Sequence, residues 1–173
     1  EQGSFTNGIK DGVWRGYYTN GAERWVETFV VGVRNGMFRL WHPNGAPQFA
    51  GLYQSGEPHG EHTTWGPDGR KRNVTTYLEG VKNGPQTVFL ADGSRLVVTF
   101  WANGLRDGAR TWYYPNGRKR WETHYLQGKA HGRWTQWADD GVMIAQSTWQ
   151  QGSLLKREAC LLYTSDAADE VQC

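Results

Sequence analysis

The chain has 173 residues, with 23 glycines, 10 tryptophans and a hydrophobic fraction of 38%. Its length suits one domain of ordinary size, and its many aromatic and glycine residues argue against both a helical globule and a disordered chain. The formal net charge is +2, or about +5 without the last residues described below, which is too small to indicate a nucleic-acid partner. No apolar run approaches the length of a membrane helix.

The start of the chain gives no information on its compartment. The first residue is Glu1, and no charged and then apolar signal segment follows it. We therefore expect the natural start to lie upstream. Cytoplasmic and exported locations both stay open.

Glycines recur along the chain with one fixed spacing. From Gly8 onward they are separated by four, nine and eleven residues, and this period of 24 is kept in six units without an insertion. A fixed period in this range is typical of an array of supersecondary units. The glycines lie at positions 8, 12, 21; 32, 36, 45; 56, 60, 69; 80, 84, 93; 104, 108, 117; 128, 132, 141; and 152.

The residues before two glycines of each unit indicate tight turns, because Asn, Asp and His tolerate left-handed backbone best among the non-glycine residues. Proline fixes φ near −65°, which excludes a type I′ turn at the third glycine and favours a type I turn with that glycine as a G1 bulge. Prolines precede it at Pro43, Pro67 and Pro115. The third glycine follows Asn20, Asn44, Asp68, Asp92, Asn116 or Asp140, and the second follows Asp11, Asn35, His59, Asn83, Asp107 or His131.

Two turns per unit leave two strands of about six to eight residues, so each unit is predicted to be a β-hairpin. The predicted fold class is all-β: an elongated, single-layer antiparallel meander of about six tandem 24-residue hairpins. We expect stability to build along the array, because a lone hairpin is marginal and each one buries its aromatics against its neighbours.

The predicted register pairs Tyr113 with Lys119 and Thr111 with Trp121. Because side chains alternate across a strand, the repeated aromatics then form two rows on one face, with small residues such as Thr123 between them. We expect both rows to be structural, since large aromatics hold neighbouring hairpins together. One row is Tyr17, Trp41, Trp65, Phe89, Tyr113 and Trp137, and the other is Phe29, Tyr53, Tyr77, Trp101, Tyr125 and Trp149.

The stretch "NGLRDGARTWYYPNGRKRWETHYLQGKAHG" resembles the bacterial variant of the MORN repeat. The resemblance covers residues 5–152 and is weakest in the fourth unit, "PQTVFLADGSRLVVTFW", which has apolar residues at the polar positions of its second strand. It implies an elongated antiparallel sheet that binds partners. Many bacterial members resemble antitoxin or immunity proteins, whereas classical MORN proteins act as membrane-associated scaffolds.

The last residues have no counterpart in the repeats. "CLLYTSDAADE", residues 160–170, resembles the translation of a sequencing-library adapter. We therefore predict one MORN-variant array at residues 1–159, truncated at its N-terminus, and a non-native tail at residues 160–173. Without this tail the chain has no cysteine, and its net charge is about +5, from 19 basic and 14 acidic residues.

The residues do not predict an enzyme, because catalytic groups must converge in a pocket and a one-layer sheet offers few pockets. The repeated acidic residues are explained by turn chemistry. His59 and His62 are spaced like a metal pair, but His59 occupies a repeated turn position and nothing nearby completes a zinc site. No catalytic residue, metal or cofactor is predicted.

Two sets of residues are the candidates for partner binding. The predicted register places Trp14, Phe38, Trp112, Tyr114 and Trp134 on the face opposite the aromatic rows, where large exposed aromatics favour partner contact. The run "RKR" occurs at Arg70, Lys71 and Arg72 and again at Arg118, Lys119 and Arg120. These runs are predicted about 19 Å apart along one sheet edge, where they would attract phosphate or an acidic partner if they are not solvated turn flanks.

The sequence thus favours a non-enzymatic protein-binding scaffold of antitoxin or immunity type, whose partner would be a toxin. Two alternatives stay open. One is an aromatic repeat array that binds carbohydrate or cell wall, and the other is binding to lipid headgroups at a membrane surface through the basic turns. No nucleic-acid partner is expected.

Overall fold

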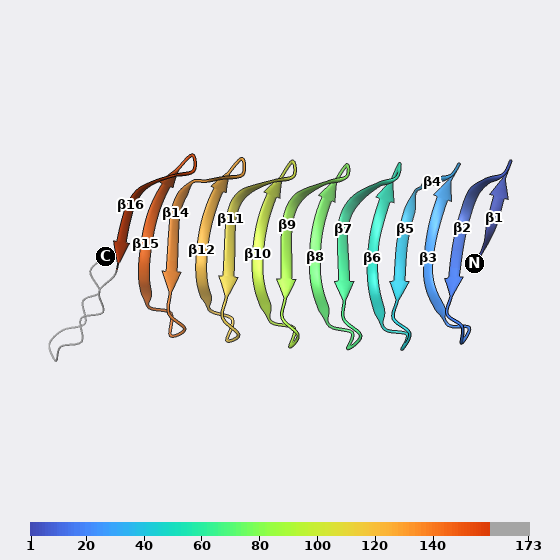
Figure 1. Cartoon of the computed structure of the whole chain (residues 1–173), viewed down its shortest axis with the longest axis horizontal. Helices are drawn as coiled ribbons and strands as arrows, with labels where there is room; N and C mark the ends of the chain where they lie inside the picture. Colours follow the sequence, from blue (N-terminus) through green and yellow to red (C-terminus); the bar gives the residue numbers. More distant parts are fainter. Residues whose placement is uncertain (160–173) are drawn as a thin grey trace. The chain divides into compact units, whose positions relative to one another are not determined.

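The computed structural model describes residues 1–159, which form an antiparallel all-β meander (Figure 1). The chain divides into two units, Glu1–Gly93 and Ser94–Cys173. The first unit holds β1 (Gln2–Thr6), β2 (Ile9–Tyr17), β3 (Glu23–Val30), β4 (Val33–Arg34), β5 (Gly36–Trp41), β6 (Pro47–Gln54), β7 (Glu57–Trp65), β8 (Lys71–Leu78) and β9 (Val81–Phe89). The second holds β10 (Arg95–Ala102), β11 (Leu105–Tyr113), β12 (Lys119–Leu126), β13 (Lys129–Ala130), β14 (Gly132–Trp137), β15 (Met143–Gln150) and β16 (Ser153–Ala159).

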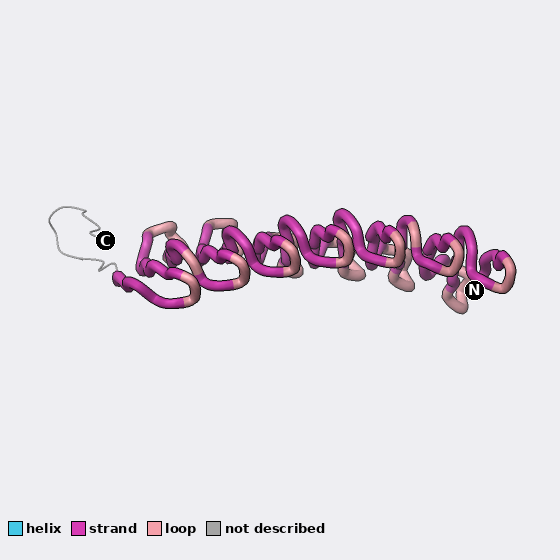
Figure 2. Tube along the Cα trace, turned by 90° about the horizontal axis from the view of Figure 1, so that it is seen from above, coloured by secondary structure: helices cyan, strands magenta, loops and turns pink. Residues whose placement is uncertain are grey.

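Within each unit the strands pair in chain order, apart from the two-residue strands β4 and β13, which pair with β3 and β12. Figure 2 shows that the hairpins of each unit are bowed and not flat. The predicted all-β antiparallel meander of tandem hairpins is confirmed. The predicted tail, residues 160–173, lies outside the described residues.

The turn at the third glycine has the predicted geometry. The Tyr114 N–H donates to the Arg118 carbonyl at 2.9 Å, and the Gly117 N–H donates to the Tyr114 carbonyl at 2.9 Å. Gly117 has a φ of 83°, so it is the left-handed residue of a type I turn with a G1 bulge. The preceding Asn116 accepts a hydrogen bond from the Arg118 N–H at 3.0 Å, as an Asx turn does.

The prediction of a turn at the second glycine is wrong. The other turn lies at the first glycine, where Asn103 and Gly104 have φ values of 49° and 79° and join β10 to β11 as a two-residue type I′ hairpin. Gly108 lies inside β11 with a φ of 95°, in a bulge between the pairs Thr99–Arg110 and Trp101–Arg106. Residues such as Asp107 therefore precede a bulge and not a turn.

The predicted register is also wrong by one residue in β12, and this error places the side chains that follow it on the wrong face of the sheet. Tyr113 does pair with Lys119, but Trp112 pairs with Trp121 and Thr111 with Glu122, because Arg120 is an extra residue in β12. Such a bulge shifts the alternation by one residue and turns the rest of the strand over. The rows headed by Tyr17 and Phe29 therefore lie on opposite faces.

The face that carries Trp112, Trp121, Thr123 and Tyr125 is called the aromatic face below. Its middle is a central row, to which each repeat contributes one side chain: Trp14, Phe38, His62, Gln86, Arg110 and Trp134. Small partners make room for this row. A Cβ at Gly51 would lie 2.7 Å from the His62 ring, and Thr75 and Thr123 are the most deeply buried side chains of their units.

Candidate functional site

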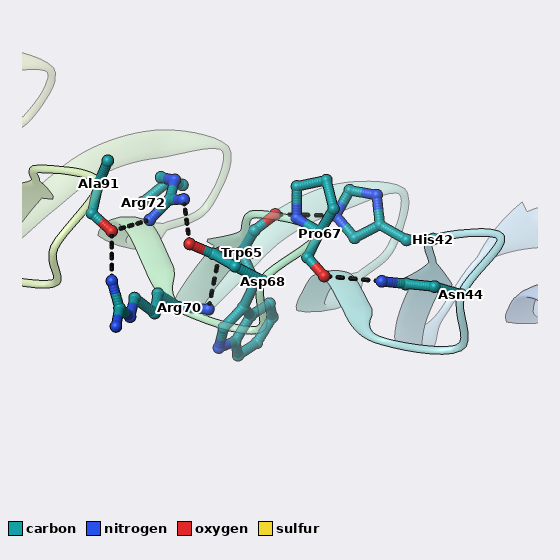
Figure 3. Close-up of polar contacts among 8 residues, drawn as sticks. All are labelled: His42, Asn44, Trp65, Pro67, Asp68, Arg70, Arg72 and Ala91. Carbon is teal, nitrogen blue, oxygen red and sulfur yellow. Dashed lines mark hydrogen bonds and ion pairs between the residues drawn. The ribbon is translucent and has the colours of Figure 1, made fainter.

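The two arginines of the first basic run form hydrogen bonds with their own turn and with the next turn along the chain (Figure 3). The Arg72 guanidinium donates to the Asp68 carboxylate at 2.7 Å, and this contact lowers the pKa of Asp68. Arg70 and Arg72 also donate to the Ala91 carbonyl at 3.2 and 3.4 Å. Lys71 lies exposed at the start of β8. The two arginines thus have partners within the sheet, which explains their place after the turn.

In the second basic run, Arg118 and Lys119 form polar contacts within the sheet, whereas Arg120 stacks on an aromatic ring. Arg118 donates to the Asp139 and Asp140 carbonyls at 3.1 and 2.6 Å, and Lys119 forms an ion pair with Glu122. Arg120, the bulge residue, lies over the Tyr114 ring at 5.6 Å and forms no ion pair within residues 1–159. Of this run, Arg120 alone borders the hollow described below.

The candidate aromatics lie on a different face from the one predicted. Trp14, Phe38, Trp112 and Trp134 share the aromatic face with the row that contains Tyr125. Several have structural contacts: Trp14 is buried and its Nε1–H donates to the Ser4 carbonyl at 3.1 Å, and Phe38 packs on Phe49 with ring centroids 5.4 Å apart.

Tyr114 links neighbouring repeats. Its hydroxyl donates to the carbonyl of Trp137, one period further on, at 2.9 Å. The Tyr18 hydroxyl makes the same bond to the Trp41 carbonyl, and the His42 ring lies 3.1 Å from the Trp65 carbonyl. Tyr114 thus connects one repeat to the next. Its residue type alone does not indicate this role.

The second unit has an open groove on its aromatic face. Trp112, Trp121, Tyr125 and Trp134 line it, with Thr123 between them and Arg120 at its border, and its volume is about 380 Å³. The Trp134 ring lies 5.7 Å from the Tyr125 ring, and the Trp134 Nε1–H donates to the His124 carbonyl, so this wall is held in place. The groove therefore brings together three predicted candidates, Trp112, Trp134 and Arg120.

A second hollow of about 300 Å³ continues past Trp121 and Trp134 toward β16, where Leu154 and Arg157 line it. Trp121 stands between the two hollows and is 37% exposed. Trp121 is not among the predicted candidates, because the predicted register contains no bulge at Arg120. That bulge is separate from the G1 bulge at Gly117, and no glycine or proline marks it in the sequence.

Two further arginines lie on this face of the second unit. Arg106 lies over the Trp101 and Tyr125 rings at 5.9 and 5.4 Å, and Arg110 lies over the Trp112 ring at 4.3 Å. Burial, and next the charge of Arg106, lower the pKa of Arg110, whereas the contact and hydrogen bond with Tyr125 oppose this. The Arg110 Nε is buried without a hydrogen-bond partner in the described part of the chain. These contacts place positive charge beside the aromatic groove.

The central row of the first unit contains a buried histidine with an apolar surround. The His62 ring lies between Phe49, Tyr53 and Tyr77, with centroids 5.4, 5.2 and 4.9 Å away, and its Nε2 lies 2.8 Å from the Leu52 carbonyl. Burial lowers the pKa of His62, although the Leu52 contact opposes this. Residues 1–159 contain no group of three or more His, Cys, Asp or Glu side chains suited to hold a metal ion.

One repeat of the chain matches a known family. Residues 106–127, which span most of β11, the turn at Pro115 and β12, match the family model described as the MORN repeat variant. This unit is a MORN repeat variant. The other 24-residue units of the chain share its spacing of glycines and its two turns. MORN repeats commonly form protein-binding scaffolds. No curated protein matches the chain.

The matched MORN unit is the one that supplies Arg106, Arg110, Trp112, Arg120, Trp121 and Tyr125. Most of the groove is therefore built by a single repeat, and the next one adds Trp134. No helix within residues 1–159 has the length and apolarity needed to cross a membrane.

Proposed function

We propose that this MORN-repeat chain is a non-enzymatic protein-binding scaffold that holds its partner in the aromatic groove of the second unit. The observation that carries the proposal is the groove itself, where two tryptophans pair across β11 and β12 and Trp121 keeps 37% of its surface exposed. Partly exposed tryptophan beside arginine is the composition that dominates binding energy at protein interfaces.

The finer proposal is that the scaffold is of antitoxin or immunity type and that its partner is a toxin. It rests on the resemblance to bacterial MORN proteins. A stoichiometric, inhibitory complex between the chain and one cytotoxic protein would be its outcome. Coexpression that does not relieve the toxicity of the captured protein would remove this finer proposal and leave the scaffold.

The experiment compares the chain with two single variants as bait. Trp121→Ala removes the exposed groove tryptophan. Phe100→Ala is the matched control, because Phe100 is 44% exposed and follows Thr99 in β10, so that the alternation places it on the opposite face. Each bait is immobilised, exposed to bacterial lysate, and the retained proteins are quantified after its fold has been checked by circular dichroism.

We expect one protein to be retained at a near-equal amount by the wild-type chain and by Phe100→Ala. Trp121→Ala should weaken that retention by about thirtyfold, the effect of losing a contact of roughly 2 kcal/mol. Equal retention by all three baits, or retention of glycan or anionic lipid vesicles in place of a protein, would contradict the proposal. The last two results would support the carbohydrate and membrane-surface alternatives.

A further inference from the structure

The first unit contains an arginine–glutamate pair on its aromatic face. The Arg34 Nε and Nη2 atoms lie 2.8 and 2.7 Å from Oε2 of Glu27, whose residue surface is only 8% exposed. The same guanidinium lies over the Phe38 and Tyr53 rings at 5.1 and 4.8 Å. The carboxylate and the aromatic rings together replace the water contacts that the partly buried Arg34 guanidinium has lost.

Three periods later the same positions lack the acid. Arg106 takes the position of Arg34, and Tyr125 that of Tyr53, but Thr99 stands in place of Glu27. Thr99 is buried, and Arg106 keeps the contact with the equivalent tyrosine, at 5.4 Å to the Tyr125 ring. Its second ring contact, at 5.9 Å, is with Trp101. The arginine half of the pair is thus retained in the second unit without its carboxylate.

A second arginine adds further positive charge that no carboxylate of residues 1–159 balances. Arg110 replaces Phe38 in the central row, and neither Arg106 nor Arg110 forms an ion pair within the described chain. The Arg110 guanidinium forms a hydrogen bond with Tyr125, but its Nε is buried without a partner among the described residues. A buried donor left unpaired is costly unless a ligand supplies an acceptor. Its proximity to Arg106 adds like-charge repulsion, which lowers the pKa of Arg110 beyond the effect of burial.

We propose that Arg106 and Arg110 form a carboxylate site that takes an aspartate or glutamate side chain of the protein partner held in the groove. This inference rests on the proposed function. Trp112, which Arg110 covers, and Tyr125, which Arg106 covers, both line the groove, so the site and the groove are continuous. An acidic residue beside an apolar one is therefore the sequence that the partner presents, and its carboxylate occupies the place that Glu27 fills in the first unit.

The first experiment does not need the partner. The full chain, labelled with ¹⁵N, is titrated with a penta-glutamate peptide, and the arginine Nε–H resonances are followed by NMR. A penta-glutamine peptide is the neutral control. We expect saturable shifts of the Arg106 and Arg110 resonances with the acidic peptide, and none with the neutral one. Equal shifts with both peptides, or stronger binding of inorganic phosphate than of the acidic peptide, would overturn the site.

Two variants test the assignment within the same titration. Arg110→Gln should abolish the shift of Arg106 or weaken peptide binding about tenfold or more, the loss of a charge-assisted hydrogen bond. It should fold, because Gln86 occupies the equivalent position in the fourth repeat. Arg133→Gln makes the same charge change on the opposite face, where the Arg133 residue is exposed and pairs with Thr148, and should leave binding unchanged.

Thr99→Glu supplies the missing carboxylate from within the chain. It should pair with Arg106 as Glu27 does with Arg34, and should prevent the acidic peptide from binding. A Thr99→Glu chain that is folded and still binds the peptide as the wild type does would overturn the site.

The lysate experiment separates this inference from the proposed function. Retention of the protein that depends on Trp121 and on Arg110, but not on Arg133, supports both. Retention that depends on Trp121 and is unchanged in Arg110→Gln contradicts the carboxylate site and leaves the scaffold. Retention that does not depend on Trp121 contradicts the scaffold, and the peptide titration then decides the site alone.

Discussion

At the scale of single residues, the type I′ turns impose the least favourable backbone of the fold. Each requires a left-handed residue before its first glycine, and the chain places Asn7, Val31, Ser55, Glu79, Asn103, Gln127 and Gln151 there. Asn is the favoured residue, whereas Val31, with a φ of 49°, is β-branched and pays the full steric cost. The side chain of Val31 compensates little, because the residue is 69% exposed.

We therefore expect Val31→Asn to stabilise the chain by about 1 kcal/mol, the usual cost of a left-handed non-glycine backbone. Urea unfolding followed by tryptophan fluorescence would measure it. Val30→Asn is the control: Val30 ends β3 in extended conformation, where valine is favoured, so this change should lower stability slightly. If the two variants behave alike, backbone strain at residue 31 is not the cause.

At the scale of strands, the close approach of Gly51 to His62 fixes how β6 and β7 pack. A Cβ at residue 51 would lie 2.7 Å from the His62 ring, which cannot move aside because aromatic rings surround it. We expect Gly51→Ala to destabilise the chain by about 1–3 kcal/mol, as overpacking of a filled core does. The cost should largely disappear in a His62→Ala background. A double-mutant cycle by urea unfolding measures this, and additive effects would contradict the packing explanation.

Strand packing also shows what could be predicted from the sequence. The period, the hairpins and the G1 bulge at Gly117 follow from glycine spacing and proline positions, which are local constraints on φ. The face of each aromatic does not, because it depends on whether Arg120 is counted in the ladder. A single extra residue reverses all later side chains, so the groove at Trp121 was not predicted. Of its aromatics, Tyr125 was predicted in a structural row, and Trp112 and Trp134 were predicted as binding candidates on the opposite face.

The tight bond between neighbouring repeats gives a further test at this scale. Tyr114→Phe removes only the hydroxyl that donates to the Trp137 carbonyl. We expect a loss of about 1 kcal/mol, since that carbonyl loses a partly buried partner. Hydrogen exchange should become faster at the amides of the turn between β14 and β15. Unchanged exchange there would mean that the ring and not the hydroxyl joins the repeats.

At the scale of the whole molecule, a buried ionisable group makes the free energy of unfolding depend on pH. Burial keeps the pKa of His62 below its ordinary value of about 6.5 in the folded chain, so the unfolded chain binds the proton more readily. The stabilising contribution of neutral His62 is therefore complete above pH 6.5. It is lost as the pH falls below that value toward the folded pKa.

Thermal unfolding at pH 8, 7, 6 and 5 would measure this effect. We expect the unfolding midpoint to fall between pH 7 and pH 5, and His62→Phe, which copies Phe38 of the preceding repeat, to make this fall smaller. The aromatic neighbours do not contribute, since burial raises the pKa of Tyr77 above its ordinary value of 10.0 and the ring stays neutral over this range. An equally large fall in His62→Phe would assign the acid sensitivity to other groups. It would also mean that burial of His62 does not make its protonation unfavourable in the folded chain.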